Sequence, residues 1–527
     1  MEAKLKRIAT DIYSFEDLIS RNSLYVDKTD FIHEMLTGDT DYFFLSRPRR
    51  FGKSLTISTL KAVFQGKREL FKGLKIEHLD YDWKEYPVIH LDMGRVATET
   101  REILNESLNN LLHILAEDLN IILSEAIYAP HLFQELINKA YKMGKVVLLI
   151  DEYDKPLTDN FGMPHLEEVR ILMENFYAVV KASDPYLRFV LMTGVAKFAK
   201  VSIFSKLNNL YDITMDSQYA CMLGYTQEEL EDNFTPYLDK IVAEQGLVKE
   251  DFMAEIKLFY NGYKFDENAS TVYNPVSFGM FLKNKGKFKN YWFATGTPSL
   301  LMKLAKEQSL DLTEMLSRRV ESIYFDAFDI SKLQLMPLLI QTGYLTIDNA
   351  EIIDGRMRYQ FDFPNVEVEE AFLTHILTAY STDSLPDTTD LLDRFKKHLD
   401  SENIDDLIQE LQSFYASIPY DLNNKASTEA YYHTVFYCIF HLLPYRFNAE
   451  MHTNKGRIDA VCESYKAVFI FEFKHNESAE IAMDQTKTRG YADKYASLGK
   501  PIHLVAINFS SDDKNITESK HEICALN

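Results

Sequence analysis

Tyr42-Phe43-Phe44-Leu45-Ser46-Arg47-Pro48-Arg49-Arg50-Phe51-Gly52-Lys53-Ser54 is the stretch that decides the first fold. A short apolar run ends, a compact loop follows, and the sequence after Gly52 has the apolar spacing of a helix. This strand–loop–helix order is typical of a phosphate-binding loop. Such a loop needs inward-facing main-chain N–H groups, a lysine for the outer phosphates and a hydroxyl for Mg²⁺. We therefore predict that Gly52, Lys53 and Ser54 bind ATP, with Ser54 on Mg²⁺.

The loop departs from the usual phosphate-binding pattern at its start. Arg47 stands where the first glycine of that pattern is expected, and Pro48 has no N–H to donate. Two roles remain open for Arg47, Arg49 and Arg50: they replace the lost main-chain donors, or they contact a partner's phosphate. In either case we expect Arg47 and Arg50 to be part of the nucleotide site.

Three further apolar runs complete the first pattern. Residues 87–92, 145–150 and 187–192 read as strands, and helical periodicity covers 100–142 and 166–182. This alternation predicts an α/β core with a parallel sheet. Asp151 and Glu152 follow the second of these strands, at the edge where such sheets bind ligands. We expect Asp151 to hold Mg²⁺, Glu152 to act as general base, and Thr193 to sense the γ-phosphate or the attacking water.

The middle of the chain has a different composition. Residues from about 220 to 320 are helical and rich in aromatic side chains. A helix at 332–342, a turn at Asp354-Gly355 and a strand at 357–363 suggest a winged helix, and 381–390 is the best linker candidate. We expect a P-loop domain at 1–220, a helical lid-like region at 221–325, a winged-helix module at 326–380, a helical linker at 381–425 and a second α/β domain at 426–527.

A second set of polar residues lies near the C-terminal end of the sequence. The run 468–474 predicts a strand with three phenylalanines on one face and Glu472 and Lys474 on the other. An exposed, salt-bridged strand would explain Glu472 and Lys474 alone. With Asp459 on a preceding strand, we instead expect Asp459 and Glu472 to bind Mg²⁺ and Lys474 to orient or deprotonate water.

Two flanking helices add further candidates to this site. Glu429 lies on a helix before the strands and can supply another carboxylate. Gln485 and Arg489 are one turn apart on the helix after the strands, and we expect them to face the same cleft or a phosphate.

Composition limits the function classes. The net charge of −22 over 527 residues argues against binding nucleic acid through bulk charge, but not against a local basic groove. The four cysteines have no metal-like spacing and favour a reducing compartment. The N-terminus lacks a signal-peptide core, and no apolar run is as long as a membrane span. We expect a cytoplasmic protein without a membrane partner.

These motifs resemble two known families. Asp459 with Glu472-Phe473-Lys474 resembles the core of the PD-(D/E)XK nuclease superfamily, Glu429 matches its first-helix acid, and Gln485 matches a glutamine often found on its next helix. Residues 1 to about 300 resemble the bacterial AAA-ATPase-like domain, through 25–29, 47–54, 149–154 and 193–195. The arginine-rich loop is the usual form in that family. The superfamily often has proline before its first acid, where this chain has Ile458.

The resemblance implies a P-loop ATPase joined to a restriction-endonuclease-like α/β domain. We expect an ATPase that gates a Mg²⁺-dependent nuclease acting on nucleic acid, DNA more than RNA. The alternative is a nucleotide-switched regulator whose nuclease-like domain only binds nucleic acid or protein, and a scaffold with two inert sites is a third reading. Assembly into a homo-oligomer is compatible with such ATPases.

Overall fold

The computed structural model describes residues 5–197, 209–292, 299–308, 310–322, 324, 334–380, 385–417, 428–453 and 456–524. Contacts between Cα atoms divide the chain into two compact units. Unit 1 comprises Met1–Thr295 and Arg319–Val368, and unit 2 comprises Gly296–Arg318 and Glu369–Asn527. The five sequence ranges proposed above are a finer division and remain a prediction.

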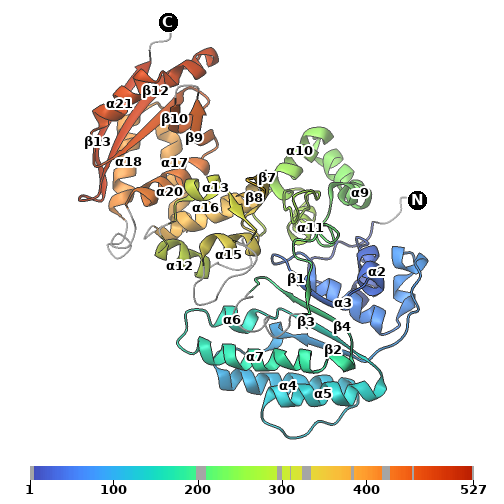
Figure 1. Ribbon diagram of the computed structural model, residues 1–527. Helices are drawn as coiled ribbons and strands as arrows, with labels where there is room; N and C mark the ends of the chain where they lie inside the picture. The colour runs from blue at the N-terminus through green and yellow to red at the C-terminus, as the bar shows by residue number, and fades with distance from the viewer. Residues whose placement is uncertain are drawn as a thin grey trace. The chain divides into compact units, whose positions relative to one another are not determined.

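Unit 1 is built on a parallel sheet with the strand order β2-β3-β4-β1-β5 (Figure 1). Every neighbouring pair in this sheet is parallel. Its strands are β1 (Tyr42–Ser46), β2 (Val88–Asp92), β3 (Val146–Asp151), β4 (Leu187–Gly194) and β5 (Tyr211–Asp212). β3 is buried along its whole length, as its nearly continuous apolar sequence requires.

Helices cover both faces of this sheet. α3 (Lys53–Phe64) packs against β3 and β2 on one face, and α4 (Arg101–Asp118), α5 (Ala129–Ala140) and α7 (Leu166–Ala182) pack together on the other (Figure 1). The expected α/β core is therefore confirmed. The stretch expected to be helical over 100–142 forms α4 and α5, which are separated by residues 119–128. Shorter helices of this part are α1 (Phe15–Ser20), α2 (Thr29–Thr37) and α6 (Lys155–Asp159).

A helical region follows the sheet, as the sequence predicts. It contains α9 (Gln227–Gln245), α10 (Lys249–Tyr260) and α11 (Pro275–Lys283). Their inner faces form one aromatic-rich core cluster that includes Phe234, Phe252, Tyr260, Phe278 and Phe281. In the part of the chain that the structure describes, no helix is both long and apolar enough to cross a membrane.

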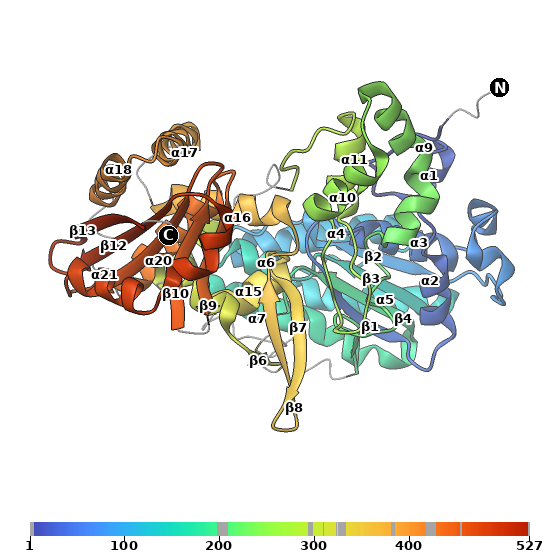
Figure 2. The same cartoon turned by 90° about the horizontal axis from the view of Figure 1, so that it is seen from above.

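The last part of unit 1 is a helix followed by a hairpin. α15 (Leu335–Thr342) leads into β7 (Thr346–Ile353) and β8 (Arg356–Asp362), and the short β6 (Val320–Glu321) adds to β8. Figure 2 shows the hairpin extending away from α15. These elements agree with the expected helix and hairpin, and their assignment as a winged-helix module remains a prediction.

Unit 2 contains a second sheet with the order β13-β12-β11-β10-β9. β11 and β12 are parallel, and the other pairs are antiparallel. The strands are β9 (Arg446–Thr453), β10 (Gly456–Glu463), β11 (Val468–His475), β12 (Ile502–Ser510) and β13 (Asn515–Cys524). The helices of this unit are α12 (Ser299–Glu307), α13 (Leu312–Ser317), most of α16 (Val366–Tyr380), α17 (Leu385–Asp400), α18 (Ile404–Ala416), α20 (Thr428–His441) and α21 (Ala479–Thr488).

The two faces of the second sheet differ as the alternation in β11 predicts. Phe471 packs against Phe436 and Phe440 of α20. On the other face, Ile470 packs with Ala482 and Met483 of α21. The sheet is therefore buried on both faces, and Glu472 and Lys474 lie on the face that α21 covers.

The linker candidate at 381–390 remains a prediction. Residues from Leu385 onward belong to α17, while 381–384 lie outside the described residues. Proline is tolerated in the first turn of a helix and acidic residues are favoured there.

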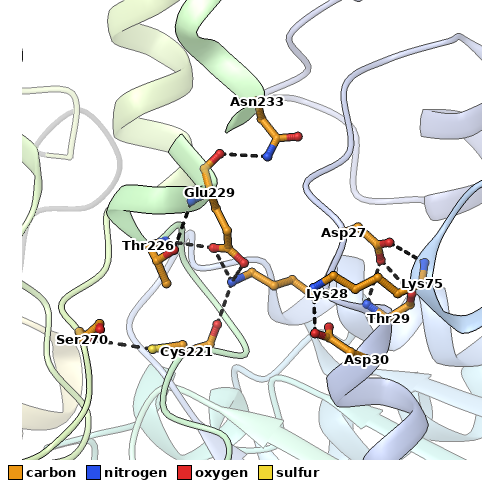
Figure 3. A network of polar contacts seen from close by, with 10 residues as sticks. All are labelled: Asp27, Lys28, Thr29, Asp30, Lys75, Cys221, Thr226, Glu229, Asn233 and Ser270. Atoms are coloured by element: carbon orange, nitrogen blue, oxygen red, sulfur yellow. Dashed lines mark hydrogen bonds and ion pairs between the residues drawn. The ribbon is translucent and has the colours of Figure 1, made fainter. Parts of the chain in front are cut away.

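A polar network joins the segment Tyr25–Thr29 to α9 (Figure 3). The Lys28 ammonium group donates hydrogen bonds to the carbonyl oxygen of Cys221, at 2.7 Å, and to the carboxylate of Glu229, at 2.6 Å. Glu229 also accepts the N–H of Thr226 in the capping box of α9. This part of the family-like sequence therefore has a structural role, because it fixes α2 to the start of α9.

We predict that Lys28→Met destabilises unit 1. The Lys28 and Glu229 side chains are only 13% and 22% exposed, so the substitution leaves a largely buried carboxylate without its cation. Removing one member of such a pair lowers the free energy of unfolding by about 2–4 kcal/mol. Thermal unfolding checks this, with the exposed Lys72→Met as the matched control. Equal melting temperatures for the two variants would contradict the structural role.

Candidate nucleotide and metal sites

The phosphate-binding loop, residues 47–52, connects β1 to α3. Gly52 is the N-cap of α3 and has φ of 96°. A Cβ at this position would meet nothing within 4 Å, so the glycine is required by backbone conformation rather than by space. The loop thus presents the unpaired N–H groups of the first turn of α3, which includes Lys53 and Ser54, toward a prospective anion.

Lys53 is buried at the centre of this loop. Its ammonium group donates hydrogen bonds to the carbonyl oxygens of Arg47, at 2.8 Å, and Pro48, at 3.0 Å. Burial lowers the pKa of Lys53, and the carboxylates of Asp151, Asp154 and Glu152 oppose this shift. The structure therefore brings Lys53 into the electrostatic range of the acidic residues after β3.

Arg47 lies inside the protein. It is 1% exposed, and its guanidinium group donates hydrogen bonds to the main-chain oxygens of Ser46, Thr214 and Tyr219. The same group lies 4.0 Å from the ring centroid of Phe265. Arg47 therefore binds main-chain oxygens at the end of β1 and in the chain after β5. This environment differs from the nucleotide contact expected from the sequence.

Arg50 has a different environment. It has φ of 68° and is partly exposed, and its guanidinium group donates a hydrogen bond of 3.3 Å to the carbonyl oxygen of Tyr291. A cation at this place in the loop, with one long hydrogen bond among the described residues, is compatible with the expected role in the nucleotide site.

The acidic residues lie where the parallel strands end. Asp151 closes β3, and its carboxylate accepts a 2.6 Å hydrogen bond from the hydroxyl of Thr193, near the end of the neighbouring β4. Asp151 also accepts the N–H of Glu152, at 3.0 Å. The structure therefore joins Asp151 and Thr193, two residues that the sequence predicted separately.

Glu152 follows Asp151 in a left-handed conformation with φ of 53°. Burial raises the pKa of its carboxylate, and the negative charge of Asp151 adds to the rise. A Cβ on Gly94 would lie 3.0 Å from Glu152 Oε2 and 2.8 Å from Asp92 Oδ1. Glu152 is thus a half-buried carboxylate with a shifted pKa, a property expected of a general base.

Two carboxylates of this edge were missed as site residues. Asp92 ends β2 directly beside Asp151, and Asp154 accepts the N–H groups of Val195 and Ala196, at 3.0 and 2.8 Å. Asp92 follows an apolar strand in the same way as Asp151, so the same rule could have found it. Asp154 holds the chain after Thr193 in place, a contact between distant segments that no local pattern reveals.

The residues of this edge fit a magnesium nucleotide. A helix N-terminus, a buried lysine and the hydroxyl of Ser54 stand at one strand end, and Asp151 stands two strands away. Hard oxygen donors suit Mg²⁺, and the lysine and N–H groups suit phosphate.

The second candidate site lies at the end of the β10–β11 ladder. In the part that the structure describes, these strands pair from Ala460↔Phe471 to Glu463↔Val468. At the next residue, Asp459, the contact with β11 is made by the side chain, because its Oδ2 accepts the N–H of Phe473 at 2.8 Å. The carboxylate thereby replaces a main-chain acceptor and comes next to Glu472.

Gln485 of α21 connects the other two polar residues of this site. Its side-chain N–H₂ donates a short hydrogen bond to Oε1 of Glu472, and its carbonyl oxygen accepts one of 3.0 Å from the ammonium group of Lys474. The structure thus unites Asp459, Glu472, Lys474 and Gln485, as the sequence predicted. Arg489, the C-cap of α21, donates a hydrogen bond to the Tyr491 hydroxyl at 2.9 Å.

The electrostatics of this site are dominated by Glu472. Burial raises the pKa of this carboxyl, and the charge of Asp459 raises it further. Lys474 and Arg489 oppose the shift. Glu472 is 1% exposed, and its Oε2 is buried and accepts no hydrogen bond from the residues that the structure describes. A buried carboxylate oxygen of this kind requires a cation or a proton.

The donor set fits Mg²⁺. Among the described residues, no three His, Cys, Asp or Glu side chains form a metal-binding group. Mg²⁺, however, usually keeps several water ligands and binds through one or two carboxylates. Asp459 and Glu472 provide this number. The side chain of Glu429 lies outside the described residues, so its expected contribution remains a prediction.

Comparisons with known proteins agree with both folds. Residues 9–204 match the family described as "Predicted AAA-ATPase", and residues 427–519 match the PD-(D/E)XK nuclease superfamily. The chain is also 37% identical over 504 residues to a protein of Azotobacter chroococcum mcd 1 described as "Uncharacterized protein in vnfD 5'region". The matched region covers 93% of this chain and 94% of that protein.

The chain belongs to the family of proteins that join an AAA-ATPase-like domain to a C-terminal domain of the PD-(D/E)XK nuclease superfamily. The resemblance drawn from the sequence motifs is confirmed. The parallel sheet of unit 1 and the mixed sheet of unit 2 agree with this pairing.

We predict that Arg47→Lys destabilises unit 1 even without nucleotide. Lysine cannot donate to the Ser46, Thr214 and Tyr219 oxygens together, and buried carbonyl groups that lose a donor cost about 1–3 kcal/mol. We expect a loss of about 2–3 kcal/mol in thermal or denaturant unfolding. Arg49→Lys, with its neighbouring position in the loop, is the control. If Arg47→Lys lowers nucleotide affinity while unfolding stays unchanged, Arg47 is a nucleotide ligand instead.

Proposed function

We propose that this protein is an ATPase that controls a Mg²⁺-dependent nuclease acting on DNA. The observation that carries the nuclease half is Gln485 hydrogen-bonded to both Glu472 and Lys474, with Asp459 beside them on the Phe473 N–H and one buried Glu472 oxygen that has no partner among the described residues. The observation that carries the ATPase half is Lys53 at the N-terminus of α3, within electrostatic range of Asp151 and Glu152.

In unit 1, each residue has a defined part. Lys53 and the N–H groups after Gly52 bind the phosphates. Ser54 and Asp151 would hold Mg²⁺, which would supply positive charge to the phosphates during phosphoryl transfer. Glu152 accepts a proton from the attacking water, for which its raised pKa is suited. Thr193 fixes the Asp151 carboxylate through the 2.6 Å hydrogen bond and so positions the metal ligand.

In unit 2, Asp459 and Glu472 hold the metal. The bound Mg²⁺ would activate water and stabilise charge on the scissile phosphate. Lys474 places an ammonium group beside Glu472, where it orients the attacking water or the phosphate. Gln485 hydrogen-bonds to both Glu472 and Lys474 and so holds them in place. This arrangement keeps the Lys474 ammonium group from forming a direct salt bridge with Glu472.

A second function is supported by the overall charge. At a net charge of −22, binding of nucleic acid depends on local cationic groups such as Lys474 and Arg489. A regulator that is switched by nucleotide, and whose nuclease-like domain only binds nucleic acid or protein, fits this charge as well. Cleavage assays separate the two functions.

We predict distinct losses for substitutions in the two sites. Lys53→Ala should abolish nucleotide binding and ATP turnover. Asp459→Asn and Glu472→Gln should lower Mg²⁺-dependent cleavage of single- and double-stranded DNA by about 100-fold or more, because metal stabilisation supplies several kcal/mol. Both should leave ATP binding unchanged. The measurements are ATP hydrolysis and DNA cleavage by the full chain, with RNA of the same sequence as a comparison substrate.

Glu480→Gln, an exposed residue on α21, is the matched control for the nuclease site. Undiminished cleavage by Asp459→Asn and Glu472→Gln would refute the site. ATP turnover without any cleavage by the wild type would favour the nucleotide-switched regulator. Loss of cleavage in Lys53→Ala would establish that the nucleotide controls the nuclease.

A further inference from the structure

The phosphate-binding loop contacts the segment at which the chain first leaves unit 1. Arg50 donates its 3.3 Å hydrogen bond to the carbonyl oxygen of Tyr291. Trp292 follows, and the chain enters unit 2 at Gly296. The loop that would hold the phosphates is therefore hydrogen-bonded, through the Arg50 side chain, to the last residues of unit 1 before the chain enters unit 2.

Glu367 holds the same segment from the other side. Its Oε1 accepts the N–H groups of both Tyr291 and Trp292, each at 2.7 Å, and its own carbonyl oxygen accepts the side-chain N–H₂ of Asn290, also at 2.7 Å. Glu367 is 0% exposed and lies in the first turn of α16, just before the chain enters unit 2 again at Glu369. One buried carboxylate thus links two segments of unit 1, residues 291–292 and the start of α16, each of which precedes a point where the chain enters unit 2.

The Glu367 carboxylate lies in electrostatic range of Arg50. Burial raises the pKa of Glu367 to about 7, and the hydrogen bonds from residues 291 and 292 and the charge of Arg50 oppose that rise. Tyr263 and Tyr291 are the other titratable groups in electrostatic range of it. Arg50 and Glu367 thus bind the same residue, Tyr291, from its carbonyl oxygen and its N–H group, and the charge of Arg50 favours the ionised carboxylate. Arg50 is also a residue of the prospective phosphate site.

A second contact converges on the same place. A Cβ on Gly343 would lie 2.5 Å from Pro48 of the loop, so the turn after α15 packs directly on the loop. The next residue, Tyr344, packs edge-on against the Trp292 indole, with 4.5 Å between ring centroids. Movement of the loop would therefore reach Trp292 by two routes, through Arg50 and through the Gly343–Tyr344 turn.

We propose that Glu367 is a positioning residue that couples nucleotide binding at the phosphate loop to the chain connections between the two units. This proposal rests on the proposed function, because it requires a nucleotide at the loop. A phosphate near Arg50 competes with the Tyr291 carbonyl for the guanidinium group, and charge-assisted hydrogen bonds are stronger than neutral ones. Arg50 then withdraws its charge from Glu367, which loosens the hold of that carboxylate on residues 291 and 292.

The experiment uses Trp292 as a reporter in the full chain. The protein has two tryptophans, so Trp83→Phe leaves the indole of Trp292 as the single fluorophore. We expect ATP with Mg²⁺ to change Trp292 emission in this background. Glu367→Gln, which keeps the shape but removes the charge, should reduce that change by at least about five-fold, the lower end of measured coupling between sites. Arg50→Ala should have the same effect.

ATP binding is measured in parallel by competition with a fluorescent ATP analogue. Glu370→Gln, at an exposed glutamate further along α16, is the control and should retain the full emission change. We also expect Glu367→Gln to bind ATP within about three-fold of the parent while losing nucleotide-dependent control of cleavage. A purely structural role for Glu367 would change stability and leave the emission response intact.

The two failures are distinguishable. If the parent protein does not bind ATP, the proposed function fails at its first step. If the parent binds ATP but Trp292 emission stays constant, or responds equally in Glu367→Gln and Arg50→Ala, the coupling through Glu367 is refuted while the ATPase proposal stands. The Glu367→Ala variant, which also removes both main-chain contacts, should give an even smaller response if it folds, and Glu367→Gln keeps the test valid if it does not.

Discussion

The conformation of the phosphate-binding loop is fixed by contacts between its side chains and neighbouring segments of unit 1. Arg47 is bonded to the chain after β5, Pro48 packs on Gly343, and Arg50 is bonded to Tyr291. The Phe51 ring lies 4.7 Å from that of Tyr263 and 5.5 Å from that of Phe265. A glycine-rich loop adopts its conformation because its backbone is permissive. In this loop the side chains of Arg47, Pro48, Arg50 and Phe51 are buried or bonded to neighbouring segments and so hold the backbone in place.

That constraint explains why an arginine can stand at the start of the loop. A buried guanidinium group is costly unless its donors are satisfied. Here carbonyl oxygens from three residues accept hydrogen bonds from Nη1 and Nη2 of Arg47, while its Nε has no partner among the described residues. The same side chains make the loop sensitive to the helical region and to the α15–β7 turn. Because its side chains pack on neighbouring segments, the loop cannot rearrange around a ligand without moving those segments. Phosphate binding is therefore coupled to the conformation of the rest of unit 1.

Much of the fold was predictable because its signals are local. Continuous apolar runs predict buried parallel strands, and α7 occupies the range expected from periodicity. In β11, alternation correctly placed Glu472 and Lys474 on one face. The exact start of α17 at Leu385 was not predictable, since a polar first turn that contains proline has the composition of a loop.

The contacts that sequence reasoning missed join distant segments. The hydrogen bonds from Tyr291 and Trp292 to Glu367, and those from Val195 and Ala196 to Asp154, depend on how the chain folds back on itself. The role expected for Arg47 was drawn from its position in a motif. Whether an arginine in a loop points toward a ligand or into the protein depends on the neighbours it meets, which here come from residues 214, 219 and 265.

The carboxylates of the two sites also differ in a way that bears on their chemistry. Asp151 and Asp154 each accept hydrogen bonds from hydroxyl or N–H groups of the protein. Burial raises the pKa of Asp154, and the hydrogen bonds from Val195 and Ala196 oppose that rise. Glu472 has one oxygen bonded to Gln485 and another that is buried without a donor among the described residues. The pKa of Glu472 is raised because the carboxylate is buried and this second oxygen lacks a donor, so that without a cation the carboxylate favours a proton. Binding a divalent cation would satisfy that oxygen and displace the proton, so metal binding at Asp459 and Glu472 should be coupled to pH, whereas the carboxylate of Asp151 is already held by Thr193 before any metal arrives.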